Sequence, residues 1–345
     1  MGFLGRVLRR HPQASPRVRD MAARILALHP HLRLARHSQA RLEQAVGEAL
    51  DYLDALVARL PAPRLANARA WLADACMRAW FASPADVAAV ISRSPELRDW
   101  FDSHAGAPEV FAVLGMEVRE RHGFGAAMEN GTLRQDVPQT SMDFTDHQLR
   151  LCGASLEELK QEIVRRLVDQ LAMEGLAQAA ASRSRRTALQ NEQALLKTRL
   201  QLLQRQGAGM PAVLGGQPRP SGDALARVQQ DLEANEHALA SLGLQSDALE
   251  RELDTLCQVL AEPAPHLFLS RQQLRLNHAN VVQENGADGE KEEDGTVSEV
   301  ELHFARLPTT PPRMRAFSLV RFSRSELLPA PRLLDEAARL LGPRH

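Results

Sequence analysis

Apolar side chains recur at alternating intervals of three and four positions along residues 223 to 260. The eleven positions of this seam are Leu225, Val228, Leu232, Asn235, Leu239, Leu242, Ser246, Leu249, Leu253, Leu256 and Leu260. Nine of them are aliphatic, which is the a/d repeat of a coiled coil and not the broader stripe of a surface helix. The repeat therefore predicts a long helix whose apolar edge packs against a second helix.

A second helical stretch, from residue 155 to 206, precedes the seam. Ser155 and Glu158 have the spacing of a capping box at its start. Leucines then recur at every seventh position, namely Leu189, Leu196 and Leu203. Residues 207 to 222 hold five glycines and three prolines and cannot be helical. We therefore expect residues 153 to 262 to form an antiparallel coiled-coil hairpin with its tip at residues 207 to 222.

The charges of the two limbs support this pairing. Residues 155 to 206 carry nine Lys or Arg against six Asp or Glu, whereas residues 222 to 262 carry two against nine. Because the two limbs carry net charges of opposite sign, they attract each other and are expected to fold together. Asn235 and Ser246 interrupt the seam, and buried polar residues at such positions set the register of a coiled coil. Alternatively, residues 222 to 262 pair with a second copy of the chain and form a homodimer.

Helical spacing also dominates residues 1 to 105. One of the predicted helices runs from about residue 64 to 81. Ser83 and Ser94 each precede a proline, and a capping residue followed by proline at the first helical position marks the start of a helix. The pattern predicts a compact helical domain with short connections.

Strand patterns begin after residue 105. Asn130-Gly131 separates two alternating stretches and is a strong signal for a two-residue hairpin. Two more short strands are predicted at residues 140 to 145 and 148 to 152, which would complete a small meander. Strand patterns return beyond the helical hairpin, at residues 267–269, 274–282, 297–305 and 316–322.

The predicted fold is therefore α+β. A helical domain (residues 1–105) precedes a small antiparallel β-rich domain (residues 106–152 plus 263–330), which the coiled-coil hairpin of residues 153–262 interrupts. Residues 331–345 are expected to form a C-terminal helix. Neither half of the β-rich domain is large enough to hold a core alone, so its strands are expected to share one sheet.

Composition places the chain among ordinary globular proteins, with 44% hydrophobic and 25% charged residues. The three cysteines are odd in number and far apart, which argues against a disulfide framework and for a reducing compartment. No apolar run approaches the ~20 residues that span a bilayer, and the start of the chain lacks the apolar core of a secretory signal. We therefore expect a cytoplasmic protein.

The overall charge of -1 predicts neither nucleic-acid nor membrane binding. The N-terminal 42 residues nevertheless hold nine arginines and a single acid, Asp20. The arginines proposed as a basic arm are Arg6, Arg9, Arg10, Arg17, Arg19 and Arg24. Such an arm could bind nucleic acid or anionic lipid headgroups, or it could lie on an acidic surface of its own chain.

One cluster carries groups that could do chemistry. Asp143, Asp146 and His147 lie within five residues and could hold a divalent metal or act as acid and base. Asp and Thr are equally suited to a solvated turn between strands. The sequence contains no phosphate-binding Gly-rich loop, no His-Glu-x-x-His and no Gly-x-Ser-x-Gly, and no cofactor is predicted.

These patterns favour a non-catalytic cytoplasmic interaction protein that presents the coiled-coil arm to a protein partner. The apolar tip residues Met210, Val213 and Leu214 are the expected contacts. One alternative is a peripheral binder of nucleic acid or anionic membrane through the basic arm. Another is an enzyme or metal-binding protein with its site at Asp143, Asp146 and His147.

Overall fold

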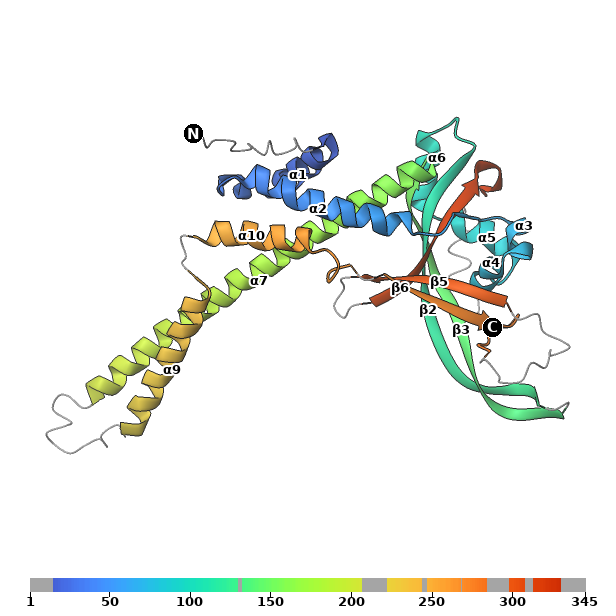
Figure 1. Cartoon of the computed structure of the whole chain (residues 1–345). Helices are drawn as coiled ribbons and strands as arrows, with labels where there is room; N and C mark the ends of the chain where they lie inside the picture. Colours follow the sequence, from blue (N-terminus) through green and yellow to red (C-terminus); the bar gives the residue numbers. More distant parts are fainter. Residues whose placement is uncertain are drawn as a thin grey trace, which may run out of the picture. The chain divides into compact units, whose positions relative to one another are not determined.

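The structure is a computed structural model that describes residues 15–129, 132–206, 222–243, 247–267, 269–283, 298–307 and 313–329. It combines helices with an antiparallel sheet (Figure 1), which confirms the predicted α+β class. The chain divides into two compact units. We call residues 1–53 with 166–266 the helical unit, and residues 54–165 with 267–345 the sheet unit.

The helical unit is built from helices that lie far apart in the sequence. They are α1 (Pro16–Leu28), the 3-10 helix η1 (Pro30–Leu34), most of α2 (Ser38–Ala58), most of α7 (Leu156–Gln206), α9 (Gly222–Ser241) and α10 (Ala248–Ala261). At the start of α7, the Glu158 N–H donates to Ser155 Oγ and the Ala154 N–H donates to Glu158 Oε2. This reciprocal capping agrees with the predicted helix start.

Helix α10 packs closely against α7. Leu253, Leu256 and Leu260 are fully buried on one face of α10. A Cβ atom added to Gly175 of α7 would lie 3.0 Å from the Cα atom of Leu256. Glycine at this position therefore lets the two helix backbones approach more closely than any larger residue would allow.

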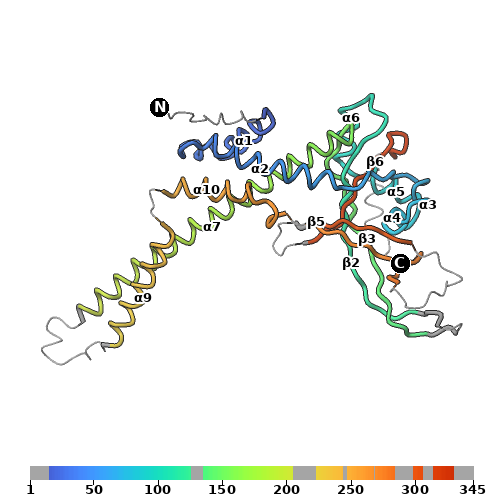
Figure 2. The backbone as a smooth tube through the Cα atoms, viewed as in Figure 1, coloured from blue at the N-terminus to red at the C-terminus, as the bar shows by residue number. Residues whose placement is uncertain are grey.

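The prediction of one unbroken helix over residues 222–262 is wrong. The stretch forms two helices, α9 and α10, which run in different directions (Figure 2). Gly243 follows α9 and adopts a φ of 74°, which only glycine reaches without cost and which ends the helix. Arg186 of α7 donates to the carbonyls of Leu242 and Gly243 and so satisfies groups that the helix end leaves unpaired.

The sheet unit contains the strands and the remaining helices. Its elements are β1 (Arg64–Leu65), α3 (Ala68–Ala73), α4 (Ala75–Trp80), α5 (Pro84–Ile91), α6 (Pro95–Ser103), β2 (Glu109–Glu129), β3 (Thr132–Gly153), β4 (Leu269–Leu276), β5 (Ser298–Leu307), β6 (Arg313–Ser323) and η3 (Arg324–Glu326). The strand order is β3-β2-β6-β5-β4, with antiparallel neighbours, and β1 pairs in parallel with β6. Strands from before and after α7 thus share one sheet, as predicted.

A short segment after β4 joins the two outer strands of this sheet. Val281 pairs with Ser141 of β3, and Val282 pairs with Leu276 of β4. The Val282 N–H also donates to the Thr140 carbonyl over 2.8 Å. Hydrogen bonding therefore runs from strand to strand in a closed ring, which protects backbone groups that an open sheet would leave unpaired along these stretches.

Strand β3 is longer than predicted. The two short strands expected at residues 140–145 and 148–152 belong to one strand that pairs with β2 over nearly its whole length. Asp146 and His147 form a bulge in it, because both lie opposite Met116 alone. The predicted two-residue hairpin is consistent with the pairing of Glu129 with Thr132, and residues 130 and 131 themselves lie outside the described residues.

The helix predicted over residues 64–81 is also wrong. Asn67 and Asp74 each accept a backbone N–H two or three residues ahead, and each begins a new short helix, α3 and α4. Local capping therefore overrides the apolar periodicity of this stretch. The caps predicted at Ser83 and Ser94 are confirmed for α5 and α6. The C-terminal helix predicted over residues 331–345 lies outside the described residues.

Helices α3 to α6 cover part of the sheet and share its core. The largest fully buried side chains of this core are Met77, Ile91, Leu97, Phe101, Leu114, Met116 and Phe322. Of the helices expected in one domain over residues 1–105, α1 and most of α2 thus belong to the helical unit, and α3 to α6 to the sheet unit. Among the described residues, no helix is long and apolar enough to cross a membrane.

The contact at Gly175 predicts a measurable loss of stability. Gly175→Ala should lower the free energy of unfolding by about 1–3 kcal/mol, because the new methyl group crowds the backbone of Leu256 and this cost exceeds the gain in helix propensity. Urea denaturation of the full chain would measure the change. Gly47→Ala in α2 is the matched control, since no atom lies within 4 Å of its added Cβ. Equal effects of the two substitutions would contradict the proposed close packing.

Candidate functional site

The structure does not bring Asp143, Asp146 and His147 together. The bulge in β3 directs Asp146 toward Arg315, whose Nη1 lies 2.6 Å from Asp146 Oδ2. Asp143 pairs instead with Arg121, with 2.5 Å between Nε and Oδ2. Within the described part of the chain, no group of three or more His, Cys, Asp or Glu side chains could hold a metal ion.

His147 lies in a different environment from the two carboxylates. Its ring stacks on that of Phe81 with 4.8 Å between the centroids. Burial lowers the pKa of His147, and its buried Nε2 has no hydrogen-bond partner among the described residues. The hydrogen bonds from Arg315 and then Gln148 lower the pKa of Asp146. The arrangement gives each residue its own structural partner and no shared reaction centre.

The basic arm is only partly within the described residues. Arg6, Arg9 and Arg10 lie outside them, whereas the remaining three arginines belong to α1. Arg24 forms a two-bond ion pair with Asp169 of α7, with N–O distances of 2.9 and 2.8 Å. At this position the arm contacts an acidic group of its own chain.

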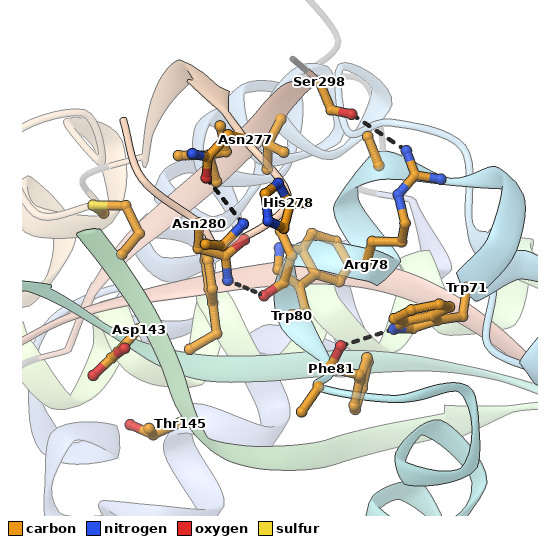
Figure 3. A pocket seen from close by; sticks show the side chains of 18 residues that line it. Trp71, Arg78, Trp80, Phe81, Asp143, Thr145, Asn277, His278, Asn280 and Ser298 are labelled. Carbon is orange, nitrogen blue, oxygen red and sulfur yellow. Dashed lines mark hydrogen bonds between the residues drawn. The ribbon is translucent and has the colours of Figure 1, made fainter. Parts of the chain in front are cut away.

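A cavity of about 1130 Å³ lies in the sheet unit (Figure 3). It lies among α3, α4, strand β3, the turn after β4 and the start of β5. Its aromatic lining consists of Trp71, Trp80, Phe81 and Phe144. Its polar and charged lining consists of Arg78, Asp143, Thr145, Asn277, His278, Asn280 and Ser298.

Hydrogen bonds hold the wall of this cavity in place. Trp71 Nε1 donates to the carbonyl of Phe81 over 2.8 Å, which fixes the indole ring (Figure 3). Asn280 adopts a φ of 57°, and its Nδ2 donates to the carbonyl of Ala79 over 2.8 Å. Asparagine tolerates this backbone conformation better than most residues. The turn after β4 is therefore tied to helix α4.

Arg78 is a charged group of the cavity without a carboxylate partner among the described residues. Its Nη1 donates to the Leu72 carbonyl over 2.8 Å and its Nη2 donates to Ser298 Oγ over 3.2 Å. No carboxylate of the described residues pairs with it. The sequence did not predict a role for Arg78, because it lies in a short helix outside any recognisable motif. Asn277 and Asn280 are residues that favour turns, so the sequence could have indicated the turn that lines this cavity but not the cavity itself.

Helices α7 and α9 form a second candidate site, in the helical unit, where they lie side by side (Figure 1). Asn235 of α9 is 5% exposed, and its Nδ2 donates to the Leu189 carbonyl over 3.2 Å and to Glu192 Oε2 over 3.1 Å. Gln193 donates to Glu236 across the same contact. The tip residues Met210, Val213 and Leu214, and Ser246 of the seam, lie outside the described residues.

Burial along the two helices follows the predicted repeat. On α7 the less exposed positions are Arg186, Leu189, Gln193, Leu196, Leu200 and Leu203. On α9 they include Leu225, Val228, Leu232, Asn235, Leu239 and Leu242. Both sets alternate at intervals of three and four. Leu195 and Leu202 of α7 lie off this seam and are 71% and 57% exposed.

Comparison of the chain with protein-family models, with curated proteins and with solved structures found no match.

The Asp146–Arg315 pair predicts a pH-dependent contribution to stability. Because the pKa of Asp146 is lowered from its ordinary value of 3.8, the charged carboxylate stabilises the fold above that pH and the contribution disappears as the pH falls further. Asp146→Asn should cost up to about 1 kcal/mol near neutral pH, a small effect because the carboxylate is 46% exposed. Asparagine accepts the φ of 48° at this position.

Chemical denaturation of both proteins between neutral pH and pH 3 would measure the difference. Asp99→Asn, at an exposed carboxylate of α6, is the matched control and should show no such trend. A stability difference that stays constant over this range would contradict the assignment.

Proposed function

We propose that the chain is a non-catalytic interaction protein whose helices α7 and α9 form an antiparallel coiled coil and present it to a protein partner. The observation that carries the proposal is the matching three-four burial on both helices. Such burial is typical of knobs-into-holes packing. The acidic α9 and the more basic α7 attract each other, and Asn235 contributes a polar contact inside the seam.

Two exposed leucines support an outward-facing contact surface on this arm. Leu195 and Leu202 are seven residues apart, so they lie on the same face of α7, away from α9. Burying both against a partner would contribute roughly 3–5 kcal/mol of favourable transfer free energy. Association itself costs a free energy of similar size, so stable binding of the partner needs further contacts. We assign these to the tip residues Met210, Val213 and Leu214.

In the proposed arrangement, α7 and α9 of the same chain pair with each other. In the alternative homodimer, residues 222 to 262 would pair with a second copy of the chain. Asn235 of α9 contacts Leu189 of α7 within one chain, which supports the intramolecular arrangement. Light scattering of the purified protein should give a mass near the 38.1 kDa of one chain. A mass of two chains would favour the homodimer.

A second candidate function is binding of nucleic acid or anionic membrane through the basic arm. Of its described arginines, Arg24 is engaged by Asp169. Membrane or nucleic-acid binding that weakens steeply with salt and is lost when the arm arginines are neutralised would support this function instead.

The proposed role of the coiled-coil arm can be tested with two matched double variants of the full chain. Leu195→Lys with Leu202→Lys should abolish recovery of a specific partner in affinity purification from the native host, because charge replaces the apolar contact. Ala194→Lys with Gln201→Lys places the same charges at exposed neighbouring positions with the same spacing. This control should retain the partner.

Deletion of residues 190–239 should have the same effect as the leucine variant. Circular dichroism should show that the leucine variant and its control keep the helical content of the wild-type protein. Equal recovery of the partner by the wild-type protein, the leucine variant and the deletion would refute the proposed role of the arm.

A further inference from the structure

The cavity of the sheet unit holds a positive charge that the described residues do not neutralise. Several other arginines of the unit pair with carboxylates, for example Arg64 with Asp74 and Arg150 with Glu96. Asp143, the one acid among the described residues of the lining, is itself paired with Arg121. Among the described residues, the cavity wall therefore carries a net positive charge centred on Arg78.

The two contacts that Arg78 makes orient its guanidinium without using up its donors. A guanidinium carries five N–H groups, and the bonds to the Leu72 carbonyl and to Ser298 Oγ occupy one on each terminal nitrogen. Arg78 is held between α3 and the start of β5 with donors left for a further acceptor. A planar fork of this kind matches the geometry of a carboxylate.

The aromatic part of the lining suits the body of an organic ligand. The Trp71 ring is held by its bond to the Phe81 carbonyl, and Trp71 and Phe144 are both half-buried, so part of each ring is accessible. Figure 3 shows Trp71 and Arg78 in neighbouring parts of the same wall. Small-molecule sites commonly combine apolar walls with a few placed polar groups in about 300–1,000 Å³. The cavity, at about 1130 Å³, is large enough.

We infer that this cavity binds a small aromatic carboxylate, with its carboxylate on the Arg78 guanidinium and its planar body against Trp71 and Phe144. The amide of Asn277 and the ring of His278 stand in the same lining and offer further donors. This site is independent of the coiled-coil arm, because all of its residues belong to the sheet unit.

Isothermal titration calorimetry on the full chain tests the inference with 2-naphthoate as the probe. The matched neutral probe is 2-naphthamide, which has the same ring and no charge. The carboxylate should bind at least about tenfold more tightly, because hydrogen bonds to a charged group are the stronger ones. This comparison uses only the wild-type protein and so does not depend on a variant folding.

Variants then locate the site. Arg78→Gln should weaken 2-naphthoate binding at least about tenfold and leave 2-naphthamide binding unchanged. Arg78→Lys should give an intermediate affinity, since it keeps the charge and loses the fork. Arg93→Gln, at an exposed arginine that follows α5, is the control and should bind like the wild-type protein. Thermal unfolding would confirm that each variant is folded.

Three results would overturn the inference: no saturable binding of 2-naphthoate, equal affinity for the two probes, or unchanged affinity in Arg78→Gln. In each of these cases Arg78 has only the structural role of holding the Leu72 carbonyl and Ser298.

Discussion

The sheet unit depends on the backbone hydrogen bonds that join strand β3 to the segment after β4. The Met142 N–H donates to the Asn280 carbonyl over 2.9 Å, and the Val282 N–H donates to the Thr140 carbonyl over 2.8 Å. These bonds close the ring of strands. They also fix Asn280, whose side chain holds α4 through the Ala79 carbonyl. The cavity around Arg78 exists because strand, turn and helix meet at this closure.

Charge pairing links elements that are distant in the sequence in both units. In the helical unit, Glu252 of α10 is only 5% exposed and accepts from both His31 and Arg183, each over 3.0 Å. Breaking such a buried pair leaves an uncompensated charge, which is costly. The guanidinium of Arg78, in contrast, donates to a backbone carbonyl and a hydroxyl and has no carboxylate partner among the described residues.

Local signals predicted those parts of the fold that depend on neighbouring residues. The caps at Ser83, Ser94 and Ser155 set helix starts because a side-chain oxygen reaches an N–H within three residues. The same locality explains two wrong predictions. Gly243 ended the long seam helix, and Asp74 divided the helix expected over residues 64–81. The positive φ of Gly243 and the side-chain cap of Asp74 each outweighed an apolar repeat that continued past them.

The sequence by itself determined the α+β class, the three-four apolar repeat of α9 and the seven-residue spacing of Leu189, Leu196 and Leu203 in α7, since helical periodicity depends on residues only a few positions apart. Only the tertiary structure decided the candidate site. The segments that line the cavity are separated by long stretches of chain, and the closed ring of strands brings them together. They lie within residues 71–82, 142–145, 276–280 and 298–300. The structure also decided the surroundings of Asp146 and His147, because the bulge at these two residues interrupts the alternation of side chains along β3.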